Sequence, residues 1–109
     1  MSIEYIGGIL YDEKLLESNE EIVIFGTGVC GKKVVEYLAK SGKKGNIVCF
    51  CDSNCGLGKS EVMGIPVCEP SETCKNYPNA DYLISGKFSG EMYALLKEKN
   101  IEKIHILIF

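Results

Sequence analysis

The stretch from Glu21 to Asp52 constrains the fold more than any other part of this 109-residue chain. It begins with a short apolar run at 22–25, rich in β-branched residues and too brief for a helix, which predicts a strand buried on both faces. A G-x-G-x-x-G motif follows at 26–31, and behind it comes a helical pattern with apolar residues on one side and charged residues on the other. A second apolar strand at 47–51 then ends on Asp52.

This order of elements predicts a Rossmann-type βαβ unit, in which each glycine has a physical role. Gly26 allows a tight turn out of the strand, and Gly28 lets a ligand approach the backbone because a Cβ would occupy the ligand's space. Gly31 lets the helix lie near the strand. The free N–H groups of the first helical turn, with the positive end of the helix dipole, suit a phosphate. The candidate binding residues of this motif are Gly26, Thr27, Gly28, Val29, Cys30 and Gly31.

Asp52 is the candidate acid of the same unit. It lies about 20 residues past the last glycine, where a carboxylate at a strand end accepts hydrogen bonds from ribose hydroxyls or from the edge of a base.

The rest of the chain adds three predicted strands, at 64–67, 81–85 and 104–109. Pro66 places the first of them at a sheet edge, because proline cannot donate to a central ladder. The strand at 81–85 is expected beside the first strand, so that its carboxyl end brings Ser85 and Lys87 to the crevice above the glycines. The predicted fold is an α/β, Rossmann-like three-layer sandwich with a mostly parallel sheet of about five strands in the order 3-2-1-4-5.

Two further helices are predicted in this half of the chain. Pro70 suits the first position of a short helix over 70–74. Ser89 is placed to cap a longer helix over 90–99. The apolar stripe of that longer helix consists of Met92, Leu95 and Leu96.

Residues 1–20 are predicted to form a separate lead-in to the nucleotide-binding domain at 21–109. Asp12 is placed to cap a short helix that carries Leu15 and Leu16. The segment either covers one edge of the sheet or forms a contact in a homodimer, and both interpretations stay open.

Charge and composition disfavour several classes of binding partner. A net charge of −3 gives no electrostatic case for nucleic acid. All 12 basic residues are lysines, so the chain has no guanidinium for a 2′-phosphate, which disfavours NADP. The chain contains no run of 18 apolar residues and does not start like a signal peptide, so no membrane partner and a cytoplasmic location are expected.

The six cysteines are expected to be thiols, and no metal site is predicted because no C-x-x-C pair occurs. Cys49 and Cys51 alternate around Phe50, and this spacing suits burial on one strand face. Cys30 stands in a helical turn that stabilises a thiolate, although packing under the glycine turn is the simpler interpretation. His105, in the middle of a strand, is interpreted as a core or flanking residue.

Four segments together resemble a known family. They are "FGTGVCGKKVVEYL" at 25–38, "FCDSN" at 50–54, "GIPVCEPSE" at 64–72 and "LLKEKNIEKIHILIF" at 95–109. They look like the small Rossmann-like domains of bacterial surface-polysaccharide loci. Such domains stand at the front of sugar O- and N-acyltransferases, occur in nucleotide-sugar dehydratases, and are fused to glycosyltransferases and methyltransferases. The resemblance covers about residues 20 to 109.

The resemblance implies that the three motif glycines and Asp52 hold a nucleotide-sugar, with Ser53 as a neighbour. This chain departs from the acyltransferase members in lacking their β-helical domain and its acyl-CoA site. Cys30 also stands in the region where many of them carry a histidine. Acyl transfer by this chain alone is therefore not expected.

Three interpretations of function remain. The first is a binding module for a nucleotide or nucleotide-sugar, such as a UDP-sugar, that acts with a sugar-modifying enzyme and has no complete catalytic machinery of its own. The second is an NAD-binding domain of the oxidoreductase type. A Y-x-x-x-K match at 93–97 does not support it. Both residues fall in the helix predicted after the strand at 81–85, and Lys97 is far from the end of that helix that lies at the glycine crevice. The third is a structural or oligomerisation domain without a ligand.

Overall fold

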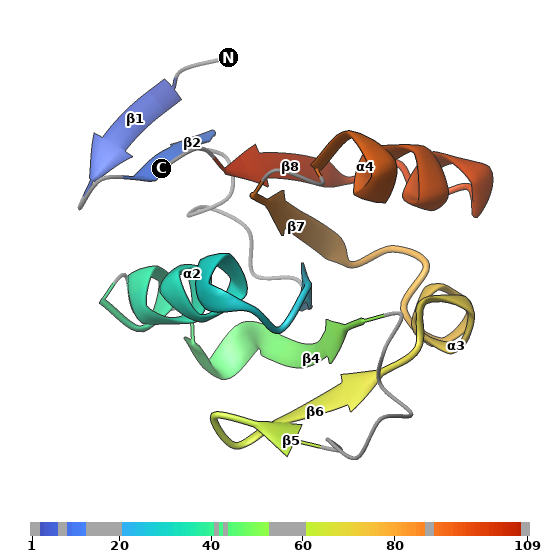
Figure 1. The fold of residues 1–109 in the computed structure, drawn as a ribbon, viewed down its shortest axis with the longest axis horizontal. Coiled ribbons are helices and arrows are strands. Elements are labelled where there is room, and N and C mark those ends of the chain that lie inside the picture. Colours follow the sequence, from blue (N-terminus) through green and yellow to red (C-terminus); the bar gives the residue numbers. More distant parts are fainter. Residues whose placement is uncertain are drawn as a thin grey trace.

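The computed structural model describes residues 3–6, 9–12, 21–40, 42, 44–52, 61–86 and 89–107. These residues include a six-stranded sheet and three α-helices (Figure 1). The strands of the sheet are β3 (Ile22–Phe25), β4 (Ile47–Cys51), β5 (Glu61–Val62), β6 (Ile65–Cys68), β7 (Asp81–Ser85) and β8 (Ile104–Leu107). The helices are α2 (Val29–Lys40), α3 (Pro70–Asn76) and α4 (Ser89–Glu98), and a short 3-10 helix, η1 (Lys44–Asn46), precedes β4.

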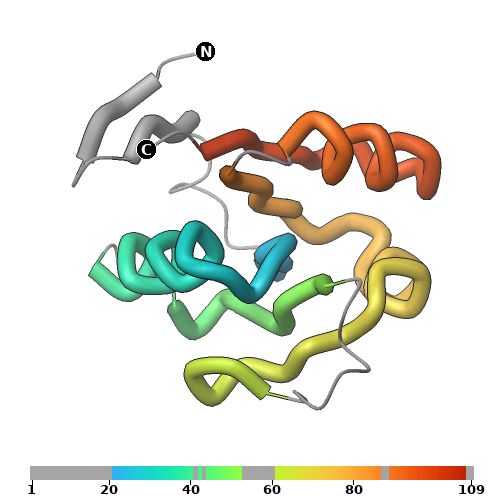
Figure 2. The backbone as a smooth tube through the Cα atoms, viewed as in Figure 1, coloured from blue at the N-terminus to red at the C-terminus, as the bar shows by residue number. Residues whose placement is uncertain are grey.

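The strands lie in the order β5-β6-β4-β3-β7-β8, and all neighbours are parallel except β5 and β6. Figure 2 shows β7 and β8, orange to red, on one side of the central strand β3 and the green β4 on its other side. The α/β class and the mostly parallel sheet are therefore confirmed. The five predicted strands lie in the predicted relative order 3-2-1-4-5, but the predicted number of strands is wrong: with the additional edge strand β5 the sheet has six strands, whose order numbered along the chain is 3-4-2-1-5-6.

The strand that was not predicted, β5, is an edge strand of two residues. It pairs with β6 through a two-residue turn in which Met63 and Gly64 both have positive φ, +53° and +77°. Two such residues match the twist of a tight hairpin, but Met-Gly is not one of the usual turn dipeptides. Gly64 therefore belongs to the turn and not to the predicted strand at 64–67, which runs from Ile65 to Cys68 in the structure.

The central strand β3 is buried on both faces, as predicted. On one face Ile22 and Ile24 pack with the α2 residues Val34 and Leu38. On the other face the core contains side chains from β3, α3 and α4, including Val23, Phe25, Cys74 and Leu96. Helices thus cover both faces of the sheet, which explains why its strands are nearly continuous apolar runs.

The three helices predicted within residues 21–107 are present, with one change in how they begin. Helix α2 ends before Gly42, whose φ of +76° and N–H bond to the Ala39 carbonyl terminate it. Helix α3 begins at Pro70 as predicted. The predicted cap at Ser89 is wrong, because Ser89 is the first residue of α4 and its hydroxyl donates to the Gly86 carbonyl oxygen at 2.6 Å. Of the predicted stripe, Leu96 is fully buried and Met92 is half-buried.

The N-terminal segment contributes an antiparallel pair, β1 (Ile3–Ile6) and β2 (Ile9–Asp12). Asp12 ends β2, and the predicted helix with Leu15 and Leu16 falls on residues outside those the structure describes. The proposed roles at a sheet edge or in a dimer stay predictions.

Tyr82 connects β7 to α3 through its hydroxyl. The side chain is fully buried, and its hydroxyl oxygen lies 2.9 Å from the Tyr77 carbonyl oxygen and 3.2 Å from that of Thr73. Tyr82→Phe removes the hydroxyl that donates to these carbonyl oxygens, so we expect a loss of about 1–2 kcal/mol in the free energy of unfolding. Urea denaturation measures this loss. Tyr93→Phe on α4, where the side chain is 43% exposed, is the control and should change stability by less than about 0.5 kcal/mol; equal effects of the two changes would contradict the prediction.

Candidate functional site

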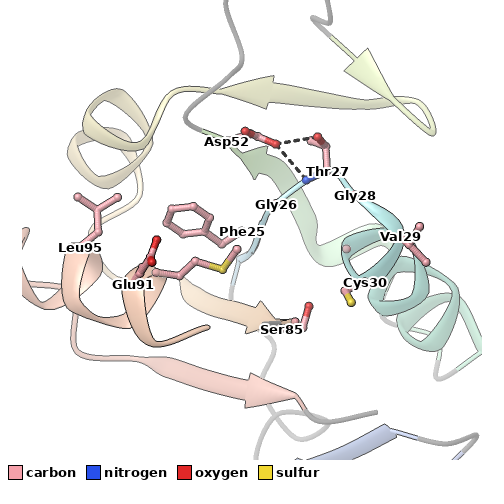
Figure 3. Close-up of a pocket in the computed structure, with 13 residues that line it drawn as sticks. Phe25, Gly26, Thr27, Gly28, Val29, Cys30, Asp52, Ser85, Glu91 and Leu95 are labelled. Carbon is pink, nitrogen blue, oxygen red and sulfur yellow. Dashed lines mark hydrogen bonds between the residues drawn. The ribbon is translucent and has the colours of Figure 1, made fainter. Parts of the chain in front are cut away.

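A cavity of about 620 Å³ lies where the carboxyl ends of β3, β4 and β7 meet the beginnings of α2 and α4. Such a position, above the carboxyl ends of parallel strands, is where open α/β sheets hold ligands. Figure 3 shows side chains from all these elements around it. The lining residues are Phe25, Gly26, Thr27, Gly28, Val29, Cys30, Gly31, Asp52, Ser85, Gly86, Glu91, Met92 and Leu95.

The glycine turn has the geometry that its sequence predicts. Gly26 has a φ of +98°, which a residue with a Cβ rarely adopts, so it allows the turn out of β3. A Cβ on Gly31 would overlap the Gly26 carbonyl oxygen, so this glycine is what lets α2 approach the end of β3. A Cβ on Gly28 would meet nothing within 4 Å, and Gly28 is exposed at the cavity. The turn therefore brings bare backbone to the cavity.

The first turn of α2 presents amide groups to this cavity. The first α-helical hydrogen bond runs from the Lys32 amide to the Gly28 carbonyl oxygen, at 3.0 Å. The amides of Val29, Cys30 and Gly31 precede that bond and have no acceptor within the helix. All three residues line the cavity. Together with the helix dipole, they make this end of the cavity favourable for an anionic group.

Asp52, directly after β4, lies at the same turn. Its Oδ2 accepts hydrogen bonds from the Thr27 hydroxyl at 2.7 Å and from the Thr27 amide at 3.1 Å (Figure 3). The carboxylate is half-buried and lines the cavity. The predicted strand-end acid and the glycine turn are thus in direct contact, although 25 residues separate Thr27 from Asp52.

A wall that sequence reasoning missed comes from the start of α4. Glu91, Met92 and Leu95 line the cavity with Phe25 at the end of β3 (Figure 3). Met92 and Leu95 were predicted only as a core stripe, and both are half-buried. Their spacing with Glu91, at i, i+1 and i+4, places all three on one side of the helix. This spacing is the only sequence signal of the wall. It does not distinguish a helix face that lines a cavity from one that packs into the core, because both produce the same apolar stripe.

Eight of the ten residues predicted for the site line this cavity: the six of the glycine motif, Asp52 and Ser85. The other two, Ser53 and Lys87, lie outside the residues that the structure describes. Cys30 is half-buried, and its sulfur would lie 3.4 Å from a Cβ built on Gly86. It therefore packs between the glycine turn and the end of β7, and also borders the cavity.

His105 does not line the cavity. Its Nε2 lies 2.9 Å from Oδ1 of Asp81, a buried residue at the start of β7. Ser85, at the other end of that strand, borders the cavity, so about 13 Å of extended chain separates Asp81 from the cavity. The structure thus places His105 in a polar pair at the opposite end of the sheet.

The buried cysteines lie in the core on the α3 side. Cys49 and Cys51 share one face of β4, as predicted, and Cys74 of α3 belongs to the same cluster. Burial, and after it the nearby Cys68 thiol, raise the pKa of the Cys49 thiol to about 12. Burial is also the main cause that raises the pKa of Cys51 and of Cys74. Among the described residues, no three histidine, cysteine or acidic side chains are arranged to hold a metal ion.

In the part of the chain that the structure describes, none of the helices has the length and apolar character needed to cross a membrane. Comparisons of the chain with protein-family models, with curated proteins and with solved structures each found no match.

Proposed function

We propose that this chain is a Rossmann-like module that binds a nucleotide or nucleotide-sugar in the cavity above the glycine turn. The observation that carries the proposal is the convergence on one cavity of the bare glycine backbone, the α2 amides and the Asp52 carboxylate. The phosphates of the ligand lie against the amides, and Asp52 faces its ribose. A UDP-sugar is the ligand that the resemblance to surface-polysaccharide domains favours, with a sugar-modifying enzyme as the partner.

The chemistry of the lining supports this orientation. The α2 end offers amide donors without requiring a basic side chain, which suits a chain whose 12 basic residues are all lysines. The apolar side chains of Phe25, Met92 and Leu95 suit the flat face of a base or the carbon face of a sugar. Asp52 accepts hydrogen bonds from hydroxyls and repels a phosphate at the 2′ position, so NADP is disfavoured relative to UDP-sugars and NAD.

Thermal unfolding in the presence of candidate ligands tests the proposal. We would compare UDP, UDP-sugars, NAD, coenzyme A and S-adenosylmethionine, each at high concentration. A ligand at about 100 times its dissociation constant adds about 2.7 kcal/mol to the free energy of unfolding. For a domain of this size the midpoint rises by about 10 °C. A shift selective for UDP compounds supports the proposal, and a shift with NAD alone supports the oxidoreductase-type alternative. No shift with any of them contradicts ligand binding and favours a structural domain.

Gly28→Val is the matched variant for this experiment. A Cβ at Gly28 meets open space and the residue does not have a positive φ, so valine fits the fold while its methyl groups enter the cavity. We expect the unliganded midpoint to change by no more than about 3 °C and the ligand-induced shift to disappear. Gly45→Val, at another open glycine away from the cavity lining, is the control and should retain the shift. A full shift in Gly28→Val would show that the ligand binds elsewhere.

A further inference from the structure

We propose that Thr27 is a positioning residue that holds the Asp52 carboxylate in the orientation that recognises a 2′-hydroxyl. The inference deepens the proposed nucleotide site and rests on it. Thr27 lies between two glycines of the motif, at a position where the motif itself places no requirement on the side chain. Both its backbone amide and its hydroxyl donate to Oδ2 of Asp52, and the hydroxyl bond is the one that requires this side chain.

The main chain around Asp52 is already held in place. The Gly26 amide donates to the Cys51 carbonyl oxygen at 2.8 Å, and the Asp52 amide donates to the Cys68 carbonyl oxygen at 3.0 Å. These bonds join the glycine turn, the end of β4 and the end of β6. With the main chain fixed in this way, the orientation of the Asp52 carboxylate depends on the two torsions of its side chain.

Thr27 restricts those torsions. The bond from its hydroxyl, at 2.7 Å, has the short length typical of a hydroxyl that donates to a carboxylate, and the amide bond at 3.1 Å reaches the same Oδ2. Both donors approach from the glycine turn, so Oδ2 is held against the loop that faces the phosphates (Figure 3). The acid that recognises the sugar is thereby positioned by the loop that binds the phosphates, and a ligand finds both already oriented.

Paired ribose and 2′-deoxyribose nucleotides test this role. Isothermal titration would measure UDP against dUDP and ADP against dADP, with the wild-type chain, Thr27→Val and Thr27→Ser. Valine has the shape of threonine and keeps the backbone amide bond, so only the hydroxyl is lost; serine restores the hydroxyl. We expect wild type to prefer the ribose form by about tenfold, Thr27→Val to prefer it by less than about threefold, and Thr27→Ser to regain most of the preference.

The outcomes separate this inference from the proposed function. If wild type binds the ribose nucleotides and Thr27→Val weakens ribose and deoxyribose forms equally, Thr27 has only a structural role and the inference is wrong. If Thr27→Val keeps the full preference, the inference is equally wrong. If wild type binds neither pair, the proposed function itself fails, and this inference fails with it. The unliganded unfolding midpoint of each variant shows whether the fold is kept.

Discussion

Gly31→Ala is expected to destabilise the domain by about 3 kcal/mol, although alanine is the better helix former. In an open helical position this change would gain up to about 1 kcal/mol. At Gly31 the new methyl group overlaps the Gly26 carbonyl oxygen and also reaches the Phe50 ring. The Gly26 backbone cannot retreat easily, because its amide is bonded to the Cys51 carbonyl oxygen at 2.8 Å. Helix α2 must therefore move away from the sheet, with the loss of packing that such overpacking brings.

Denaturant unfolding measures this cost, and Gly28→Ala is the matched control three residues earlier. A Cβ on Gly28 meets nothing within 4 Å, so the expected cost is only that of alanine at the N-cap of α2, no more than about 1 kcal/mol. Because α2 carries the amides that line the cavity, Gly31→Ala should also weaken any ligand-induced stabilisation. Equal stabilities of the two variants would contradict the close packing of α2 against the end of β3.

Raising the pH above 9 is expected to cost up to about 3 kcal/mol of stability per pH unit through the buried thiols of Cys49 and Cys51, with Cys74 acting in the same direction. In the folded chain burial raises the pKa of Cys49 to about 12 and also raises the pKa of Cys51 and Cys74, whereas the ordinary value is 9.0. Above pH 9 the unfolded chain releases these protons and the folded chain retains them, so unfolding becomes more favourable. Cys49 and Cys51 each contribute up to about 1.4 kcal/mol per pH unit.

Stability falls with rising pH because the pKa of each buried thiol is higher in the folded than in the unfolded chain. The contribution of each thiol is fully present below pH 9 and is lost as the pH rises through its folded-state pKa, about 12 for Cys49. Urea denaturation at several pH values from 8 to 10.5 would measure the slope. Cys51→Ala should reduce that slope by about one third to one half, while Val35→Ala, a buried residue without a titratable group, should lower stability equally at every pH. An unchanged slope in Cys51→Ala would contradict the prediction.

The parts of the site that the sequence predicted are those governed by local rules. The turn at Gly26 requires a positive φ, and glycine supplies it wherever the chain must turn so sharply. The burial of β3 and the amphipathic pattern of α2 are likewise properties of consecutive residues. The position of Asp52 follows from the length of one βαβ unit, because parallel neighbouring strands end at the same edge of the sheet.

The parts that the sequence did not predict depend on contacts between distant segments. Strand β5 has only two residues, and its pairing with β6 depends on the turn at Met63 and Gly64, whose positive φ angles the sequence does not indicate. Glu91 carries no local signal of a site and borders the cavity because α4 begins at the end of β7. The Ser89 hydroxyl donates to the carbonyl oxygen of Gly86, three residues earlier, whereas the preference of serine for the N-cap predicts that it accepts from a backbone amide of the helix.

Sequence alone determined the α/β class, the glycine turn and which residues of the first βαβ unit border the crevice, because these follow from backbone sterics and from apolar periodicity. Only the tertiary structure decided that α4 supplies the apolar wall and that Thr27 bonds to Asp52. The physical reason is that a hydrogen bond between residues 25 positions apart, or a wall built from a separate helix, depends on how the elements pack and not on any stretch of neighbouring residues.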